Sequence, residues 1–377
     1  MKIGLHPLWM DSDPNGGMAT YWSALIENLG KVDLGNEYTV YYTHPAAVTR
    51  SEKYRPSRFD ARLVWPSSLW LEIPFSLPWE LLRRPVDLLH VSMLAPPICP
   101  APYVTTINDI AWETHPEVFP RGLLLRLKYL IPRCARRSVH IITVSEYSKE
   151  LICETYKIPS ERVSVTPHGV TDGFRPVTDE TILDELRKRF GLSERYLLYV
   201  GKLQARKNIV RLIKAFKKGV VAADLPHKLV LIGKCTWLSN EILETIRSLG
   251  LSDRVLLLGE VQLTDLPTFY SGAELFVFPS LAEGFGLPPL EAMSCGTAVV
   301  SSSASSLPEV VGDAGVLIDP YNVDELAEAM VELIRDDTKR ASLERLGLTR
   351  ASRFSNERMA KLTLDAYETA AQRAKVA

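Results

Sequence analysis

Short apolar runs alternate with longer amphipathic segments along the whole sequence, and this alternation constrains the fold more than any other feature. Strand-length runs separated by helical segments are typical of parallel α/β architecture, and strands this apolar are expected to be covered on both faces. The runs that we expect to form strands are near Lys2–His6, Tyr38–Tyr42, Arg62–Trp65, Leu88–Val91, Val104–Ile107, Ile141–Val144, Val163–Thr166, Tyr196–Val200, Lys228–Ile232, Val255–Leu258, Leu275–Phe278, Ala298–Ser301 and Val316–Ile318.

The alternation is interrupted around Pro167–Asp179, where proline, glycine and aspartate residues gather, and a second α/β series begins at Tyr196. A chain of 377 residues is long enough for two domains, each with its own core. We therefore expect the interruption to be a hinge. The predicted domains are residues 1–172 and 173–355, with a helix at 356–374 that packs back on the first domain.

The composition favours a soluble or peripheral protein of the cytoplasm. A net charge of −1 gives no support to nucleic-acid binding, and the 5 cysteines form no C-x-x-C pair, which argues against a disulfide framework or a structural zinc site. The N-terminus shows no apolar stretch of signal-peptide length. The segment Leu88–Asn108 lacks charged residues, but its four prolines exclude a continuous membrane-spanning helix.

The residues that follow each strand deserve inspection because doubly wound folds bind ligands outside the carboxyl ends of their strands. After the run Leu275–Phe278, two glycines, Gly284 and Gly286, precede a helix with proline in its first turn. This turn lets the backbone approach an anion, and Glu283 and Glu291 on either side could accept hydrogen bonds from ligand hydroxyls. The alternative is a generic strand–loop–helix turn whose acidic residues compensate the helix dipole.

Two further turns share this character. Gly201 follows the run Tyr196–Val200 and leads through Lys202, Arg206 and Lys207 to a helix that we expect Asn208 to cap. A solvated basic loop is the alternative, but two anion-friendly turns in one domain favour a diphosphate ligand. Near the N-terminus, the segment Asp11–Gly17 carries Gly16-Gly17 before an amphipathic helix, which allows another close approach or forms an ordinary surface loop.

Together these residues resemble the retaining glycosyltransferases of family 4, which have the GT-B fold. The matching features are Glu283-x7-Glu291, Gly201 with Arg206-Lys207-Asn208, Gly16-Gly17, Ser145-Glu146 and the run Ser305–Gly315. The resemblance covers essentially the whole chain, with the motifs in the expected order. It implies two Rossmann-like domains whose parallel sheets face a central cleft, with the acceptor on the first domain and a nucleotide-sugar on the second.

The resemblance also implies roles for individual residues. Glu291 is expected to hold the donor ribose and Glu283 the transferred sugar, while Lys202 and Lys207 neutralise the diphosphate, with Arg206 a weaker candidate. The other residues expected to bind the donor are Gly16, Gly17, Gly201, Phe285, Gly286, Leu287, and Glu260 with Val261 beside the base.

One departure from the family concerns the first domain. Many members place a His-Asp pair after a strand, and the matching residues here are Asn108 and Asp109. Asparagine can bond a sugar hydroxyl but cannot act as a titrating base. We expect Asp109 either to orient the acceptor or sugar or to cap the following turn. His168, in the predicted hinge, is interpreted as structural.

We expect no catalytic metal and no cofactor besides the nucleotide-sugar substrate. The pair Asp11-x-Asp13 matches a weak metal motif of another glycosyltransferase fold, but the histidines show no ligand spacing. G-x-G-x-x-G and P-loop sequences are also absent, which argues against a dehydrogenase or a P-loop enzyme.

A basic amphipathic segment raises the question of membrane contact. No acidic residue occurs between Val118 and Ser145, whereas leucines interleave with six cations. Such a helix can lie on an anionic bilayer at the inner face of the membrane, or it can pack on the core with a solvated basic face. The aromatic residues that could line an acceptor groove or simply pack are Trp65, Trp70, Phe75 and Trp79.

The predicted reaction is transfer of a hexose from a UDP- or GDP-sugar to a hydroxyl of a glycan or lipid-linked acceptor, with retention, in cell-surface polysaccharide synthesis. A nucleotide-sugar epimerase or a sugar phosphorylase of the same fold remains an alternative. So does a non-catalytic nucleotide-sugar-binding subunit, suggested by Asn108 alone. The base, the sugar, the acceptor and the oligomeric state stay open.

Overall fold

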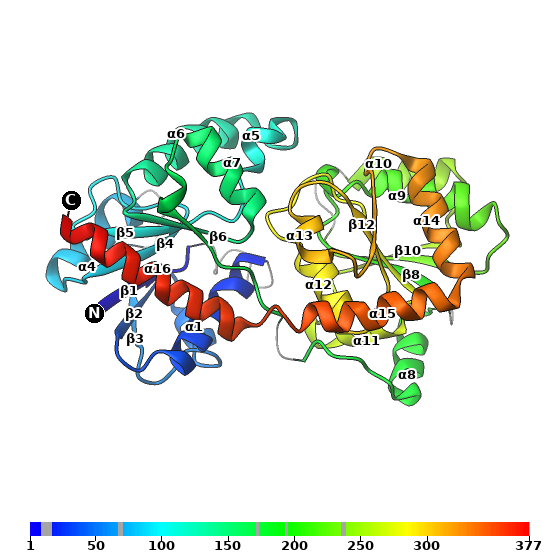
Figure 1. The fold of residues 1–377 in the computed structure, drawn as a ribbon, viewed down its shortest axis with the longest axis horizontal. Helices are drawn as coiled ribbons and strands as arrows, with labels where there is room; N and C mark the ends of the chain where they lie inside the picture. The colour runs from blue at the N-terminus through cyan, green and yellow to red at the C-terminus, as the bar shows by residue number, and fades with distance from the viewer. Residues whose placement is uncertain (9–16, 67–70, 171–172, 193–194, 235–238, 377) are drawn as a thin grey trace. The chain divides into compact units, whose positions relative to one another are not determined.

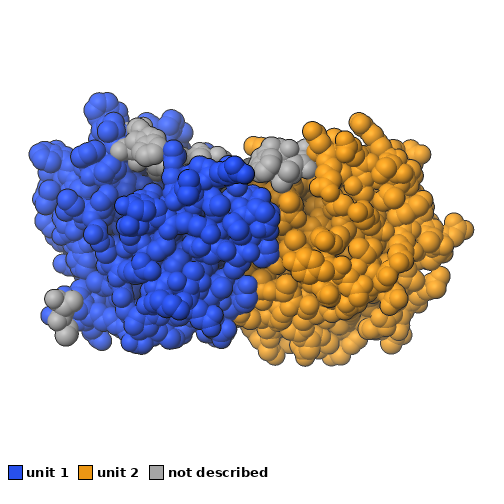
Figure 2. All heavy atoms as spheres, turned by 90° about the horizontal axis from the view of Figure 1, so that it is seen from above, with its two compact units in different colours: residues 1–169, 355–377 blue, residues 170–354 orange. Residues whose placement is uncertain are grey.

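A computed structural model describes residues 1–8, 17–66, 71–170, 173–192, 195–234 and 239–376 of the chain (Figure 1). The chain divides into two compact units, shown in separate colours in Figure 2. The first unit comprises Met1–Gly169 and Ser355–Ala377, and the second comprises Val170–Phe354. The break between Gly169 and Val170 thus falls inside the interruption Pro167–Asp179 seen in the sequence.

The described part of the first unit contains a seven-stranded parallel sheet in the order β3-β2-β1-β4-β5-β6-β7. Its strands are β1 (Lys2–His6), β2 (Glu37–Tyr42), β3 (Asp60–Leu63), β4 (Leu88–Ser92), β5 (Tyr103–Thr106), β6 (His140–Thr143) and β7 (Val163–Val165). Its helices are α1 (Gly17–Val32), α2 (Pro45–Ser51), η1 (Glu72–Ser76), α4 (Leu77–Arg83), α5 (Ala111–Thr114), η2 (Pro116–Val118), α6 (Arg121–Arg137), α7 (Glu146–Tyr156), η3 (Ser160–Arg162) and α16 (Asn356–Val376).

The second unit contains, in its described part, a six-stranded parallel sheet in the order β10-β9-β8-β11-β12-β13. Its strands are β8 (Tyr196–Val200), β9 (Lys228–Ile232), β10 (Val255–Gly259), β11 (Leu275–Phe278), β12 (Val299–Ser302) and β13 (Val316–Ile318). Its helices are α8 (Glu180–Phe190), η4 (Ala205–Lys207), α9 (Ile209–Phe216), η5 (Lys217–Val221), α10 (Ser239–Ser248), η6 (Leu263–Asp265), α11 (Leu266–Gly272), α12 (Leu287–Ser294), α13 (Leu307–Val311), α14 (Val323–Arg335) and α15 (Asp337–Ala351).

The predicted α/β class is confirmed, with strands at every position where the apolar runs placed one. The third strand is shifted: it runs from Asp60 to Leu63, and Trp65 lies beyond it with 79% of its surface exposed. The partner strand β2 ends at Tyr42, which lies opposite Leu63, and Pro66 farther along has no N–H with which to continue the pairing. The mean apolarity of a run locates a strand well but not its last residue.

Helices cover both faces of the first unit's sheet. On one face α1 and α16 lie side by side (Figure 1) and share a core with Leu5, Val40 and Val104. On the other face α4 and α6 pack against Leu89 and Val91 through the buried side chains of Leu77, Leu81 and Cys134. Alternating strand residues therefore point into two different cores, as expected for a parallel sheet.

A buried polar network fixes the C-terminal helix to this sheet. His90 of β4 lies 2.6 Å from the Tyr367 hydroxyl of α16 through Nδ1, and its Nε2 lies 2.6 Å from Thr106 Oγ1. The Tyr21 hydroxyl of α1 is 3.2 Å from the same Thr106 oxygen. Burial lowers the pKa of His90 to about 3, so the ring stays neutral and the network is one of neutral hydrogen bonds. The last helix is thus a part of the first unit's core.

Candidate functional site

Three loops follow neighbouring strands at the carboxyl edge of the second unit's sheet. The loop after β8 carries Gly201 to Asn208, the loop after β11 carries Pro279 to Gly286, and the loop after β12 carries Ser303 to Ser306. Because β8, β11 and β12 are adjacent and parallel, their carboxyl ends meet. Residues far apart in the sequence therefore come together here.

Glu283 is the centre of this cluster. Its carboxylate forms an ion pair with the Lys207 ammonium through Oε1 and lies 3.3 Å from Arg206 Nη1 through Oε2. Only 10% of the side-chain surface of Glu283 and of Lys207 is exposed. Burial by itself would raise the pKa of Glu283, but the charges of Lys207 and Arg206 outweigh it and hold the pKa below its usual value. Glu283 is therefore an ionised, nearly buried carboxylate.

Hydroxyl groups from the loop after β12 fix the backbone around Glu283. Ser305 Oγ accepts a hydrogen bond of 3.0 Å from the Glu283 N–H, and Ser306 Oγ lies 2.9 Å from the carbonyl oxygens of both Glu283 and Phe285. Gly286 has φ of 115°, and a side chain there would lie 2.7 Å from Leu307 Cδ2. The left-handed backbone favours glycine at this position, and an added Cβ would also require Leu307 to shift.

Asn208 corrects one prediction, because its side chain does not cap the helix α9. It has a left-handed backbone, with φ of 64°, and its side chain makes no capping bond to the helix backbone, although its Oδ1 accepts a bond of 2.9 Å from Arg211 Nη1. Instead its Nδ2 donates to the carbonyl oxygens of Pro279 at 3.0 Å and Pro320 at 2.6 Å. Asn208 therefore ties the loop that carries Arg206 and Lys207 to the strand end that leads to Glu283. The sequence suggested a cap because asparagine before a helix usually serves as one.

Glu291, on α12, has a different environment. The Tyr270 hydroxyl of α11 donates a hydrogen bond of 2.9 Å to Glu291 Oε2. Burial raises the pKa of Glu291 to about 7, although the bond from Tyr270 lowers it in part. Two glutamates eight positions apart thus differ in their ionisation near neutral pH, since Glu283 has cations beside it and Glu291 has a phenol. Tyr270 belongs to none of the motifs that the sequence offers.

Other residues expected at this site lie along the same edge. Gly201 has φ of 149°, and a side chain at Gly233 would lie 2.0 Å from the Gly201 carbonyl oxygen, so the ends of β8 and β9 approach closely. Lys202 is exposed, unlike Lys207. The remaining predicted residues are buried Phe285, Leu287 at the start of α12, exposed Glu260 and half-buried Val261. Glu260 follows β10, which β9 and β8 separate from β11.

In the first unit, Asn108 and Asp109 follow β5. Asn108 donates through Nδ2 to Met18 Sδ at 3.2 Å, and its carbonyl oxygen accepts from Ser148 Oγ at 2.9 Å. Asp109 Oδ1 accepts a bond of 3.0 Å from the Ala111 N–H, which is the turn-capping contact. Gly17 begins α1 with open space beside it, whereas Gly16, Asp11 and Asp13 lie outside the described residues.

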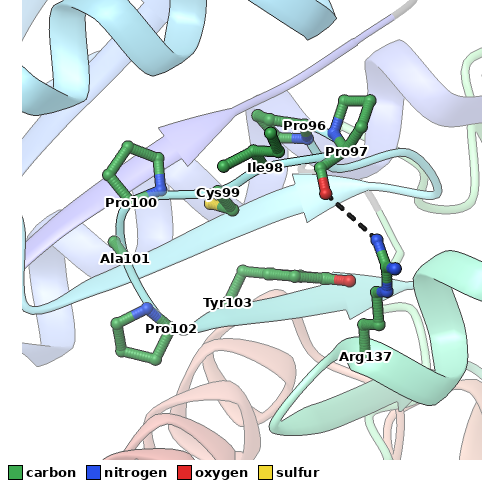
Figure 3. A pocket seen from close by; sticks show the side chains of 9 residues that line it. All are labelled: Pro96, Pro97, Ile98, Cys99, Pro100, Ala101, Pro102, Tyr103 and Arg137. Carbon is green, nitrogen blue, oxygen red and sulfur yellow. Dashed lines mark hydrogen bonds between the residues drawn. The ribbon is translucent and has the colours of Figure 1, made fainter.

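A concave feature of the first unit lies at the amino end of β5. It is an open hollow of about 560 Å³ lined by Pro96, Pro97, Ile98, Cys99, Pro100, Ala101, Pro102, Tyr103 and Arg137 (Figure 3). Arg137 Nη1 donates to the Pro97 carbonyl oxygen at 3.1 Å, and the Tyr103 hydroxyl donates to that of Cys134 at 2.8 Å. Its polar groups are thus engaged by the protein, and no predicted site residue lines it.

Two negative findings apply to the described part of the chain. Within it, no group of three or more histidine, cysteine, aspartate or glutamate side chains is arranged to hold a metal ion. None of its helices is long and apolar enough to cross a bilayer.

Comparison with known proteins identifies the family of the chain. Residues 184–348 match the model of the family "Glycosyl transferases group 1", and residues 15–173 match that of "Glycosyltransferase Family 4". The O-antigen chain mannosyltransferase B of Escherichia coli is 34% identical over 265 residues, which are 70% of each chain. The serotype-specific mannosyltransferase WbdA of Escherichia coli is 31% identical over 63% of this chain and 30% of its own length.

Solved structures share the fold. The Anabaena Alr3699/HepE structure in complex with UDP and glucose superposes with a TM-score of 0.76, covering 98% of this chain and 100% of that one. The sequence identity is 21%, so this likeness concerns the fold alone. It confirms the GT-B architecture predicted from the sequence.

The difference between Lys207 and Lys202 yields a stability prediction. We expect Lys207→Met to lower the free energy of unfolding by about 3 kcal/mol, because it leaves a nearly buried carboxylate with one cation fewer. Lys202→Met, on an exposed side chain, is expected to change it by less than about 0.5 kcal/mol. Denaturant unfolding of both variants tests this. Equal effects at the two positions would contradict the role given to the Lys207–Glu283 pair.

Proposed function

We propose that this chain, which belongs to glycosyltransferase family 4, transfers a hexose from a nucleoside-diphosphate-sugar to a hydroxyl of a glycan or lipid-linked acceptor. The observation that carries the proposal is the cluster of Glu283, Lys207 and Arg206 beside the start of α12. In this cluster the Glu283 carboxylate can accept hydrogen bonds from ligand hydroxyls, and Lys207 and Arg206 supply fixed positive charge at the same edge of the sheet. Mannose is the first sugar to test, because the relatives compared above are mannosyltransferases by name.

Charge stabilisation is the main chemistry that these residues can supply. As the bond between the anomeric carbon and the diphosphate oxygen breaks, negative charge grows on the leaving group. Lys207 and Arg206, beside the start of α12, are suited to stabilise it. In the proposed role, Glu283 binds hydroxyls of the transferred sugar and orients Lys207. Lys202 would reach the diphosphate from the solvent side.

The proposed stereochemistry is retention by displacement on one face of the sugar. The acceptor oxygen bonds to the anomeric carbon on the side from which the diphosphate leaves, and the acceptor proton passes to the leaving phosphate oxygen. Two features support this route. Glu283 is already engaged by two cations, which makes it a poor nucleophile, and Asn108 cannot titrate as a base.

The remaining assignments follow from the family. Glu291 is proposed to hold the ribose, and Glu260 with Val261 to border the base. In the first unit, Asn108 and Gly17 are proposed to contact the donor. Asp109 caps a turn and is proposed to act on the sugar only through its second oxygen. The remaining proposed donor contacts are Gly16, Phe285, Gly286 and Leu287. Since the base stays open, both UDP- and GDP-sugars are candidate donors.

We further propose that the outer side of α4 and α6 contacts an anionic membrane at its cytoplasmic face. One side of the helix over η1 and α4 exposes Leu71, Phe75, Trp79 and Leu82, with 64% of the Trp79 surface accessible, while Leu77 and Leu81 are buried. Aromatic residues in such a row suit the membrane interface.

The helix α6 adds charge on the same side of the sheet, since Cys134 shares a core with Leu77 and Leu81. The C-terminal part of α6 packs on the core through Ile131, Cys134 and Ala135, but its N-terminal part exposes Leu125 to 72% and Tyr129 to 58%. The six cations noted between Val118 and Ser145 all lie in this helix. Both interpretations of the basic segment therefore apply, each to one half of the helix, and the exposed half supports membrane contact.

The donor-site proposal predicts different kinetics for the two glutamates. Glu283→Gln is expected to lower turnover by roughly 10²-fold while the affinity for the free nucleoside diphosphate changes less than about threefold. Glu291→Gln is expected to weaken donor and nucleoside diphosphate together.

The donor is first identified by a thermal-shift panel of UDP-, GDP- and ADP-sugars, where a ligand at 100 times its Kd stabilises by about 2.7 kcal/mol. Product analysis with and without acceptor then separates transfer from epimerisation and phosphorolysis. Two glutamate variants with lower melting temperatures and unchanged kinetics would defeat the donor-site proposal.

Metal independence is a further expectation, because side-chain cations are proposed to stabilise the leaving group. Transfer measured with excess EDTA should proceed at about the untreated rate, within a factor of two. Loss of transfer with EDTA and its return with manganese would overturn this part of the proposal.

The membrane proposal predicts binding to anionic vesicles. The wild-type protein should sediment with phosphatidylglycerol-containing vesicles, less so at high salt, and Phe75→Ser with Trp79→Ser should weaken binding by at least about tenfold. Leu263→Ser removes a side chain that is 54% exposed on the second unit and serves as the matched control. Equal binding by the double variant and the control would contradict the assignment.

A further inference from the structure

Tyr270 stands apart from the residues to which the family gives a role, yet it contacts one of them directly. Its hydroxyl donates a bond of 2.9 Å to Glu291 Oε2. Among the described residues, no other group donates to this carboxylate and no lysine or arginine pairs with it. The phenol of Tyr270 is thus the partner on which the orientation of Glu291 depends.

The phenol is itself held on several sides. Tyr270 is fully buried, and its ring packs edge-on against Phe276 of β11 with centroids 5.3 Å apart. Phe174 lies 6.0 Å away on another side, and the Tyr270 carbonyl oxygen accepts a bond of 2.6 Å from Thr297 Oγ1. A hydroxyl on a ring so confined can point in few directions.

We propose that Tyr270 is a positioning residue for the nucleotide: its hydroxyl holds one oxygen of Glu291 and leaves the other for the ribose hydroxyls. This inference rests on the proposed function, in which Glu291 binds the ribose. It makes nucleotide affinity depend on a side chain that does not touch the ligand. Without this bond, the Glu291 carboxylate would be ionised over a narrower pH range, and its side-chain orientation would be less fixed.

The protonation of Glu291 gives this role a measurable signature. A carboxylate accepts hydrogen bonds from two hydroxyls only when it is ionised, and burial raises the pKa of Glu291 to about 7. The affinity for nucleoside diphosphate should therefore be full above this pKa and fall about tenfold for each pH unit below it. A bond from Tyr270 favours the ionised form, so removing it moves the transition to higher pH.

The groups around Glu291 and Tyr270 do not titrate in this range. Burial raises the pKa of Cys295, at the end of α12, to about 12, and the pKa of Tyr199 and of Tyr270 well above that of free tyrosine. The charge of Glu283 is compensated by Lys207 and Arg206. Glu291 is the group near this contact that changes charge close to neutral pH.

The test compares Tyr270→Phe with Tyr196→Phe. Tyr196 is also fully buried, and its hydroxyl donates a bond of 2.8 Å to the carbonyl oxygen of Phe269 on the same helix α11. Each change removes one buried hydroxyl and keeps the ring, so both should lower the melting temperature to a similar degree. Only the first removes a bond to Glu291.

Calorimetry with UDP and with GDP, from about pH 5.5 to pH 9, gives the readout. We expect Tyr270→Phe to raise the Kd for the nucleotide about tenfold at pH 7. The midpoint of the pH profile should move upward by about one pH unit. Turnover at saturating donor should change less than about threefold. Tyr196→Phe should keep the wild-type profile.

The outcomes separate this inference from the proposal beneath it. If Glu291→Gln abolishes nucleotide binding while Tyr270→Phe keeps the wild-type profile, Tyr270 is not a positioning residue and the ribose assignment stands. If Glu291→Gln keeps wild-type affinity, the ribose assignment fails and this inference with it. Equal profile shifts in both tyrosine variants, or a flat wild-type profile over the whole range, would also overturn the positioning role.

Discussion

The nearly buried carboxylate of Glu283 requires positive charge beside it, and the geometry at the carboxyl edge of the second unit's sheet depends on how that charge is supplied. Lys207 and Arg206 provide it from the loop after β8, although Glu283 follows β11. The contact exists because these two strands are neighbours in a parallel sheet. Asn208 and Ser306 then fix the two loops that carry the charges. The pairing of these charges therefore depends on the contacts that hold the two loops together.

The same turn creates two carboxylates with opposite behaviour. Glu283 is ionised because cations outweigh its burial, whereas Glu291 has a pKa near 7 because a phenol is the only compensation found for it among the described residues. Environments that give two acidic groups very different pKa values often mark separate roles for the two groups at one site. The division suits a ligand with a reacting part and an unchanging part, which is how the proposed donor divides into sugar and nucleoside.

The first unit combines a rigid core with an exposed apolar surface. His90, Thr106 and Tyr367 fix the last helix to the sheet through neutral hydrogen bonds. On the opposite face, Trp79 and Leu125 remain accessible although their helices are anchored by buried neighbours. The row of exposed apolar side chains on η1 and α4 is the reason why a membrane surface enters the proposal.

The sequence by itself determined the α/β class, the two-part organisation and the glycine-bearing turns at the strand ends, because periodic apolar runs and turn residues are local signals. It also picked out Glu283, Lys207 and Glu291 through a family resemblance. Only the tertiary structure decided which of these side chains touch: that Lys207 pairs with Glu283 while Lys202 stays exposed, that Asn208 joins two loops instead of capping a helix, and that Tyr270 holds Glu291. These contacts depend on the order of strands in the sheet, and that order places residues about 20 to 80 positions apart within hydrogen-bonding distance, beyond the reach of any local pattern.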